Sequence, residues 1–140
     1  MANFFEKHKL NAAQREAVET IDGYIRLTAG AGSGKTRALV TRYIYLAEEL
    51  GIDPDNILCI TFTRKAADEM KKRIAELSSI QLEGSRISTY HGFCYGVIRE
   101  DGTRLHLKKE FEIIDENEQE KIFRAIYEEK NLTLKDGELK

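Results

Sequence analysis

Residues 29–36, with the sequence Ala-Gly-Ala-Gly-Ser-Gly-Lys-Thr, constrain the fold of this chain more than any other stretch. An alternating apolar run at residues 24–29 precedes the glycines and predicts a strand. Residues 35–50 follow, with apolar side chains at helical spacing. Strand, glycine-rich turn, Lys-Thr and helix together match the phosphate-binding loop, or P-loop, G-x-x-x-x-G-K-[ST]. One position departs from this pattern, because alanine stands at position 29 in place of the first glycine.

Each residue type in this loop suits phosphate chemistry. Glycines let backbone N–H groups converge on phosphate oxygens, and the N-terminus of a helix adds partial positive charge. We expect Lys35 to reach the β- and γ-phosphates and Thr36 to offer Mg²⁺ a hard oxygen ligand, which makes these two the predicted catalytic residues. The predicted nucleotide-binding residues of the loop are Ala29, Gly30, Ala31, Gly32, Ser33, Gly34, Lys35 and Thr36. A glycine-rich helix start without a ligand is the alternative.

The hydrophobic pattern around the loop alternates between helices and strands. It predicts helices at residues 11–22, 64–77 and 91–100 and strands at 57–62 and 86–89. The continuous apolar run at 57–62 is typical of a strand buried on both faces of a parallel sheet. This order predicts an α/β fold in which helices flank a parallel sheet on both faces.

The C-terminal part of the chain reads as a helical extension. Residues 111–114 are expected to be extended, and Asp115 is expected to cap a last helix through Glu118, as a capping box. The apolar face of that helix comprises Ile122, Phe123, Ile126 and Tyr127. The polar residues 130–140 are expected to fray.

Composition narrows the class of protein. The chain has 140 residues, 41% hydrophobic and 33% charged, which suits one folded domain with its own core. Its net charge of −2 argues against binding nucleic acid by bulk charge alone. The two cysteines are too few and too far apart for a disulfide framework. No apolar run approaches the roughly 20 residues of a membrane span, and no signal peptide is evident, so we expect a cytoplasmic setting.

Residues 10–18, 60–70 and 87–93, taken together with the glycine loop, closely resemble the N-terminal region of UvrD/Rep-type superfamily 1 DNA helicases. In that family the loop normally begins with alanine, so Ala29 departs only from the generic motif. The resemblance implies a P-loop NTPase fold of the RecA-like kind, incomplete in this chain. Residues 1–105 would be the N-terminal part of the motor domain, and residues 106–140 the start of an inserted helical subdomain.

The resemblance also implies ATP and Mg²⁺ as cofactors and single-stranded DNA as a partner. Gln14 matches the family's adenine-reading glutamine, although it also fits an Asn11–Gln14 capping box, and both roles can hold. Arg37 lies near the nucleotide or is a solvated helix charge. The residues matching DNA-contact segments are Phe62, Thr63, Arg64, Thr89, Tyr90 and His91. The alternatives are core packing for Phe62, and a helix start with Thr89 as cap and Tyr90 buried. The family usually has asparagine at position 64.

Hydrolysis of ATP in this fold needs a carboxylate pair and arginines that stabilise the transferring phosphate. In the family these come from a later Asp-Glu-x-Gln segment and from a second motor domain. The pair Asp115–Glu116 is not that segment, because Gln119 falls one position too late and Asp115 fits a helix cap. We therefore expect the N-terminal piece of a helicase that moves along single-stranded DNA, able to bind ATP but not to unwind DNA. Another P-loop enzyme, such as a small-molecule kinase, and a stand-alone nucleotide- or single-strand-binding module are the alternatives.

Overall fold

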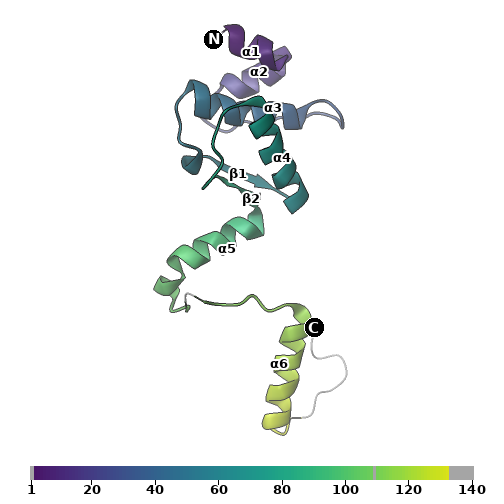
Figure 1. Cartoon of the computed structure of the whole chain (residues 1–140). Coiled ribbons are helices and arrows are strands. Elements are labelled where there is room, and N and C mark those ends of the chain that lie inside the picture. Colours follow the sequence, from purple (N-terminus) through teal and green to yellow (C-terminus); the bar gives the residue numbers. More distant parts are fainter. Residues whose placement is uncertain (1, 109, 133–140) are drawn as a thin grey trace. The chain divides into compact units, whose positions relative to one another are not determined.

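The computed structural model describes residues 2–108 and 110–132 (Figure 1). The elements in chain order are α1 (Ala2–His8), α2 (Ala12–Glu19), α3 (Lys35–Ile44), the π-helical turn η1 (Tyr45–Glu49), the 3-10 turn η2 (Pro54–Asn56), β1 (Leu58–Thr61), α4 (Arg64–Leu77), β2 (Arg86–Thr89), α5 (Tyr90–Asp101), the 3-10 turn η3 (Gly102–Leu105) and α6 (Glu116–Glu129). The chain divides into two compact units, Met1–Ile98 and Arg99–Lys140. The predicted fraying of residues 130–140 lies largely outside the described residues.

The first unit is built around a two-stranded parallel sheet. β1 and β2 are joined by α4, in register Cys59 with Ile87 and Thr61 with Thr89. Parallel neighbours need a crossover connection of this kind, and α4 supplies it while packing on both strands. The α/β class and the parallel pairing are confirmed, in a sheet of two strands.

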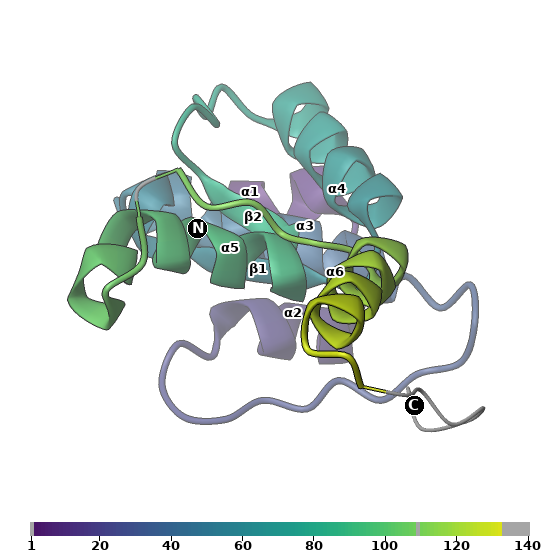
Figure 2. The same ribbon diagram turned by 90° about the horizontal axis from the view of Figure 1, so that it is seen from below.

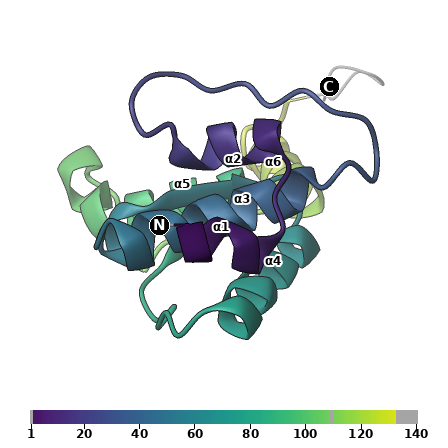
Figure 3. The same cartoon turned by 90° about the horizontal axis from the view of Figure 1, so that it is seen from above.

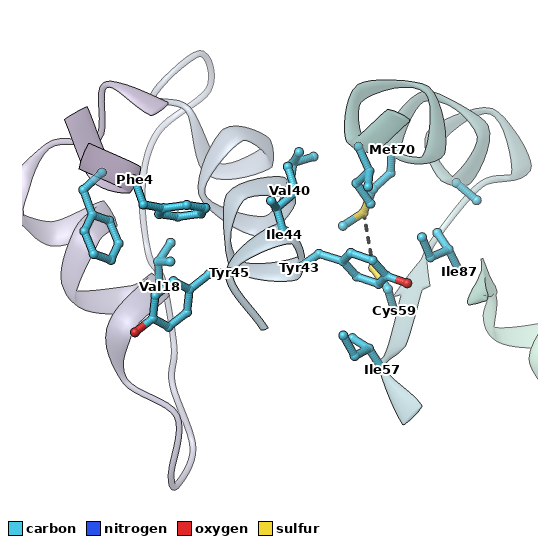
Figure 4. Close-up of a cluster of buried hydrophobic side chains, with 13 residues drawn as sticks. Phe4, Val18, Val40, Tyr43, Ile44, Tyr45, Ile57, Cys59, Met70 and Ile87 are labelled. Atoms are coloured by element: carbon cyan, nitrogen blue, oxygen red, sulfur yellow. Dashed lines mark hydrogen bonds between the residues drawn. The ribbon is translucent and has the colours of Figure 1, made fainter. Parts of the chain in front are cut away.

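The helices of the first unit pack in series beside this sheet. α3 contacts both α2 and α4 and lies between them (Figure 3). The core contains Val18 of α2, Ile44 of α3 and Ile87 of β2, each at most 1% exposed (Figure 4). Ile74 of α4 belongs to the same cluster and is fully buried. One core cluster therefore fixes the helix that opens at the glycine loop relative to the sheet.

Both cysteines are free thiols, as the sequence predicts. Cys59 is buried in the core and its Sγ lies 3.2 Å from Sδ of Met70 (Figure 4). Burial raises the pKa of the Cys59 thiol, so this cysteine is a packing residue of the core and not a reactive thiol.

The strand predicted at residues 24–29 is wrong for this structure. These residues have no regular secondary structure and run through the open connection between α2 and α3 (Figure 2). Tyr24 is fully exposed and Ile25 is 42% exposed. A strand forms only where its backbone groups find partners, and the two-stranded sheet described here pairs nothing with this segment.

The expectation that residues 57–62 are buried on both faces is also wrong. Cys59 is buried, whereas its neighbours Leu58 and Ile60 are 47% and 40% exposed. Helices cover the Cys59 face of β1, and the opposite face remains partly open. A single covered face is what a two-stranded sheet with one crossover helix can achieve, so the predicted flanking on both faces is not realised in the described residues.

Three elements were not predicted, and they are α1, η2 and η3. α1 packs against η1, with the rings of Phe4 and Phe5 each 5.5 Å from the ring of Tyr45. The turn η3 follows α5 directly.

Within the second unit α6 forms as predicted, and its Asp115–Glu118 capping box is present in both directions. Residues 111–114 have no regular secondary structure.

Candidate functional site

The glycine loop is shaped by two residues in the left-handed region of backbone space. Gly32 has φ 75° and Gly34 has φ 87°, a conformation that side chains with a Cβ rarely adopt. The hydroxyl of Ser33 donates to the carbonyl oxygen of Gly30 at 2.7 Å and closes the turn. The loop therefore needs glycine at these two positions for its backbone course.

The loop ends at the N-terminus of α3. Gly34 is the N-cap, and the N–H of Ala38 donates to its carbonyl oxygen, the first hydrogen bond of the helix. The N–H groups of residues 35–37 consequently have no acceptor within the helix. Unpaired N–H groups and the helix dipole together form an anion-attracting end.

Lys35 bends back over the loop. Its Nζ donates to the carbonyl oxygens of Ala29 and Gly30, both at 2.6 Å. The lysine is exposed, as are Thr36 and Arg37 beside it. A cationic amine therefore sits against the loop while the hydroxyl of Thr36 follows on the first helical turn.

Gln14 ties α2 to this loop. Its side-chain Nε2 donates to the carbonyl oxygen of Ser33 at 3.0 Å, and its Oε1 accepts from the N–H of Asn11. The side chain of Asn11 accepts in turn from the N–H of Gln14, so the predicted capping box is confirmed. Gln14 is only 7% exposed. One side chain thus caps a helix and contacts the glycine loop at once.

The second set of predicted residues lies at the carboxyl ends of the two strands. Thr61 and Thr89 are register partners, so the residues that follow each of them start from the same edge of the sheet. Phe62 is 99% exposed and Tyr90 is 63% exposed. This overturns the alternatives in which Phe62 is core and Tyr90 is buried.

Hydroxyl groups fix the backbone at this edge. The Oγ1 of Thr63 accepts from the N–H of Ala66 and caps α4. The Oγ1 of Thr89 accepts from the N–H of Gly92 at 3.1 Å, so its predicted capping role is confirmed. Arg64 opens α4 and is exposed, and the exposed His91 stacks edge-on to Tyr90 with ring centroids 6.0 Å apart.

Arg42 is the residue that sequence reasoning missed. It extends from α3 to backbone carbonyls of α2 and of the residue after it. The sequence does carry a signal, because position 42 falls on the apolar stripe of α3, between Leu39 and Leu46, where a charge is unexpected.

Two absences hold for the residues that the structure describes. None of their helices has the length and apolar character needed to cross a membrane. No group of three or more His, Cys, Asp or Glu side chains among them is placed to hold a metal ion.

The glycine-rich turn leads into α3 through Lys-Thr, in the same compact unit as a parallel β–α–β crossover, and these features are typical of P-loop proteins, although the strand that precedes the loop in that motif is not formed here. Comparison with known families gives the particular group. The chain belongs to the UvrD/REP helicase N-terminal domain family, whose profile matches residues 10–140. The resemblance inferred from the motifs is therefore confirmed.

The curated relatives agree with this assignment. The chain is 43% identical over 131 residues to a probable DNA helicase II homolog of Mycoplasma capricolum, which covers 94% of this chain and 18% of that protein. It is 41% identical over 129 residues to the ATP-dependent DNA helicase PcrA of Staphylococcus aureus, covering 92% and 18%. The PcrA of Bacillus subtilis is 45% identical over 123 residues, covering 88% and 17%. The chain thus spans about a fifth of the length of the curated relatives it matches.

Proposed function

We propose that this chain is the N-terminal ATP-binding portion of the motor of an ATP-dependent DNA helicase that moves along single-stranded DNA. Residues 1–105 would form the first part of the motor domain, and residues 106–140 would begin an inserted helical subdomain. The observation that carries the proposal is the contact between Gln14 and the glycine loop, because it joins the amide proposed to read adenine to the turn proposed to bind phosphate. The names of the relatives point to the same activity.

The loop has the donors that a triphosphate requires. The unpaired N–H groups at the start of α3 and the Nζ of Lys35 would hold the phosphates, and the two bonds from Lys35 to loop carbonyls would then be exchanged for phosphate oxygens. The hydroxyl of Thr36 suits Mg²⁺, which prefers hard oxygen ligands. The ion would neutralise phosphate charge, and Arg37 on the same exposed turn would lie near the nucleotide.

The exposed strand ends suit single-stranded DNA. Phe62 and Tyr90 offer two aromatic faces at one edge of the sheet, and bases stack on such faces irrespective of sequence. Arg64 and His91 stand next to them and can donate to phosphate, as can the hydroxyls of Thr63 and Thr89. The exposure of Phe62 and Tyr90 at these helix starts favours a role in ligand binding over a role in core packing.

The chain alone is proposed to bind both ligands without turning ATP over. Asp115 of the Asp115–Glu116 pair is the N-cap of α6, and its side chain accepts a hydrogen bond there. This pair therefore has a structural role and is not proposed to hydrolyse ATP. A carboxylate pair that activates water, and arginines that stabilise the transferring phosphate, would come from further parts of the parent protein.

The test combines two measurements on the purified chain. Fluorescence anisotropy of a labelled oligothymidylate should report binding that weakens as salt rises, because phosphate contacts release counterions. ATP turnover, with and without the oligonucleotide, should equal that of the Lys35→Ala variant. No oligonucleotide binding at low salt would remove the DNA half of the proposal, and turnover that depends on Lys35 would overturn the proposed incompleteness.

A further inference from the structure

We infer that Arg42 is a positioning residue for adenine selection, which acts by locking α2, and with it Gln14, onto the P-loop helix. This inference rests on the proposed adenine contact of Gln14. It assigns to Arg42 an effect on which base is accepted, although Arg42 lies on the part of α3 remote from the loop.

The contact is a clamp on the end of a helix. The Nη1 of Arg42 donates to the carbonyl oxygens of Ala17 at 2.6 Å, Val18 at 3.3 Å and Thr20 at 2.5 Å. The last carbonyls of a helix lack intrahelical partners, and a cation at this end also complements the helix dipole. One guanidinium therefore contacts carbonyls at the end of α2 and the carbonyl of the residue that follows the helix.

The opposite end of α2 is tied to the same structural body. Gln14 donates to the carbonyl oxygen of Ser33 in the loop, and that loop continues into α3, the helix that carries Arg42. Gln14 and Val18 lie one turn apart on the buried face of α2, at 7% and 0% exposure. α2 is thus held at both ends by one loop–helix segment, and its freedom to shift along or roll over α3 is removed.

Besides these two polar contacts, α2 is held by its buried Val18 and by Arg15, whose guanidinium lies 4.6 Å from the ring centroid of Phe5 on α1. Its connection to α3, residues 20–34, has no regular secondary structure up to the glycine turn. The exposed ion pair of Arg15 with Glu19 lies within α2 and does not tie it to another element. Among the residues that the structure describes, no carboxylate forms an ion pair with Arg42, so its backbone contacts to α2 are its polar function. Without them the C-terminal end of α2 would lose its polar contacts to α3, and the contact of Gln14 with Ser33 would be the remaining polar contact described here between α2 and the loop.

The experiment compares ATP with GTP and with inorganic tripolyphosphate, by calorimetric titration of the whole chain in Mg²⁺. Arg42→Ala should weaken ATP binding by roughly tenfold, the size of one hydrogen-bond contribution, and reduce the preference for ATP over GTP by the same factor. Tripolyphosphate binding should stay within about twofold, because the loop is unchanged. Arg42→Lys should restore part of the preference, since it keeps the charge. Arg73→Ala removes an arginine from α4 and is the control, so it should leave ATP binding and the preference for ATP over GTP unchanged.

A second readout is independent of nucleotide. Amide hydrogen exchange in α2 should quicken in Arg42→Ala while exchange in α4 stays as in the wild type. A wild-type chain without preference for ATP over GTP would overturn the adenine role of Gln14 and this inference together. A wild-type preference that survives in Arg42→Ala would overturn this inference and leave the proposed function standing. Equal loss of ATP and tripolyphosphate binding would also overturn it, because that pattern indicates a general structural role.

Discussion

Gln14 and Gly34 stand so close that no side chain fits between them. A Cβ added at Gly34 would lie 2.6 Å from Nε2 of Gln14, and Gly34 also has φ 87°. The glycine that caps α3 is therefore required twice, once for its backbone conformation and once for the amide that packs against it. The loop and the proposed base-reading side chain are one unit.

The Gly34→Ala variant tests the coupling between Gln14 and the glycine loop. Alanine would displace Gln14 and would also cost about 1–2 kcal/mol for its left-handed backbone. We expect lower stability and loss of the preference for ATP over GTP, measured by denaturant unfolding and by nucleotide titration. The matched control is Gly51→Ala, because Gly51 has φ 66° and open space around it, so it should lose stability without losing the preference. Equal nucleotide preference in the two variants would contradict the coupling of Gln14 to Gly34.

The aromatic strand ends give a prediction for DNA. Phe62→Ala and Tyr90→Ala should each weaken oligothymidylate binding by about 1–3 kcal/mol, the value of one stacked base. Both side chains are largely exposed, so unfolding should be little affected. Tyr24→Ala, which removes a fully exposed aromatic from the connection before the loop, should leave DNA affinity as in the wild type. An equal loss in all three variants would argue that aromatic content, rather than the strand-end position, decides binding.

The core cluster gives a prediction for stability. Ile74 of α4 is fully buried, so Ile74→Ala should lower the free energy of unfolding by about 2–5 kcal/mol. Ile122→Ala on α6, whose side chain is 47% exposed, should change it by less than about 0.5 kcal/mol. Urea unfolding followed by circular dichroism measures both. Similar losses would mean that α6 is as well packed as α4 in solution.

His8 gives a prediction for pH. Burial, and then the charge of Lys7, lower the pKa of His8 below its ordinary 6.5, while Glu48 opposes the shift. Within the described structure its Nε2 has no hydrogen-bond partner. The unfolded chain therefore takes up the proton first, and stability should fall as pH drops below about 6.5. Above that value both states are neutral at this site and the contribution vanishes.

His8→Phe should flatten this dependence between pH 7.5 and about 5.5, because phenylalanine cannot titrate among Phe4, Phe5 and Tyr45. Thermal unfolding across that range is the measurement. Identical slopes for the variant and the wild type would show that His8 does not titrate differently in the folded and unfolded chain. Carboxylates contribute mainly below about pH 5, outside the chosen window.

Periodicity and capping chemistry predicted the elements that depend on local sequence. α4 has the predicted bounds, Arg64–Leu77, because an apolar stripe and the Thr63 cap act within one helix. The Asn11–Gln14 and Asp115–Glu118 capping boxes follow from residues three apart. Local rules also place Lys35 at the first position of α3, after a glycine turn.

The failures have a common physical origin, which is dependence on distant partners. Residues 24–29 have a strand pattern but no neighbour in the two-stranded sheet, so their backbone forms no strand pairing. The apolar run at 57–62 is covered on one face only, for the same reason. Arg42 was missed because its acceptors are 22 to 25 positions away in the sequence. The contact of Gln14 with Ser33 spans 19 positions and was not predicted either, because family resemblance implied only a role for Gln14 in reading adenine.

Binding of ATP by the purified chain tests the central claim most directly. Calorimetric titration with ATP and Mg²⁺ should give one site, and Lys35→Ala should abolish it or weaken it at least tenfold, since a charge-assisted contact is worth about 1.5–3 kcal/mol. Lys35 is exposed, and its hydrogen bonds within the described residues go to loop carbonyls, so the variant should unfold like the wild type. Equal ATP affinity in the two proteins, or no heat of binding by a folded wild-type chain at millimolar ATP, would contradict the account.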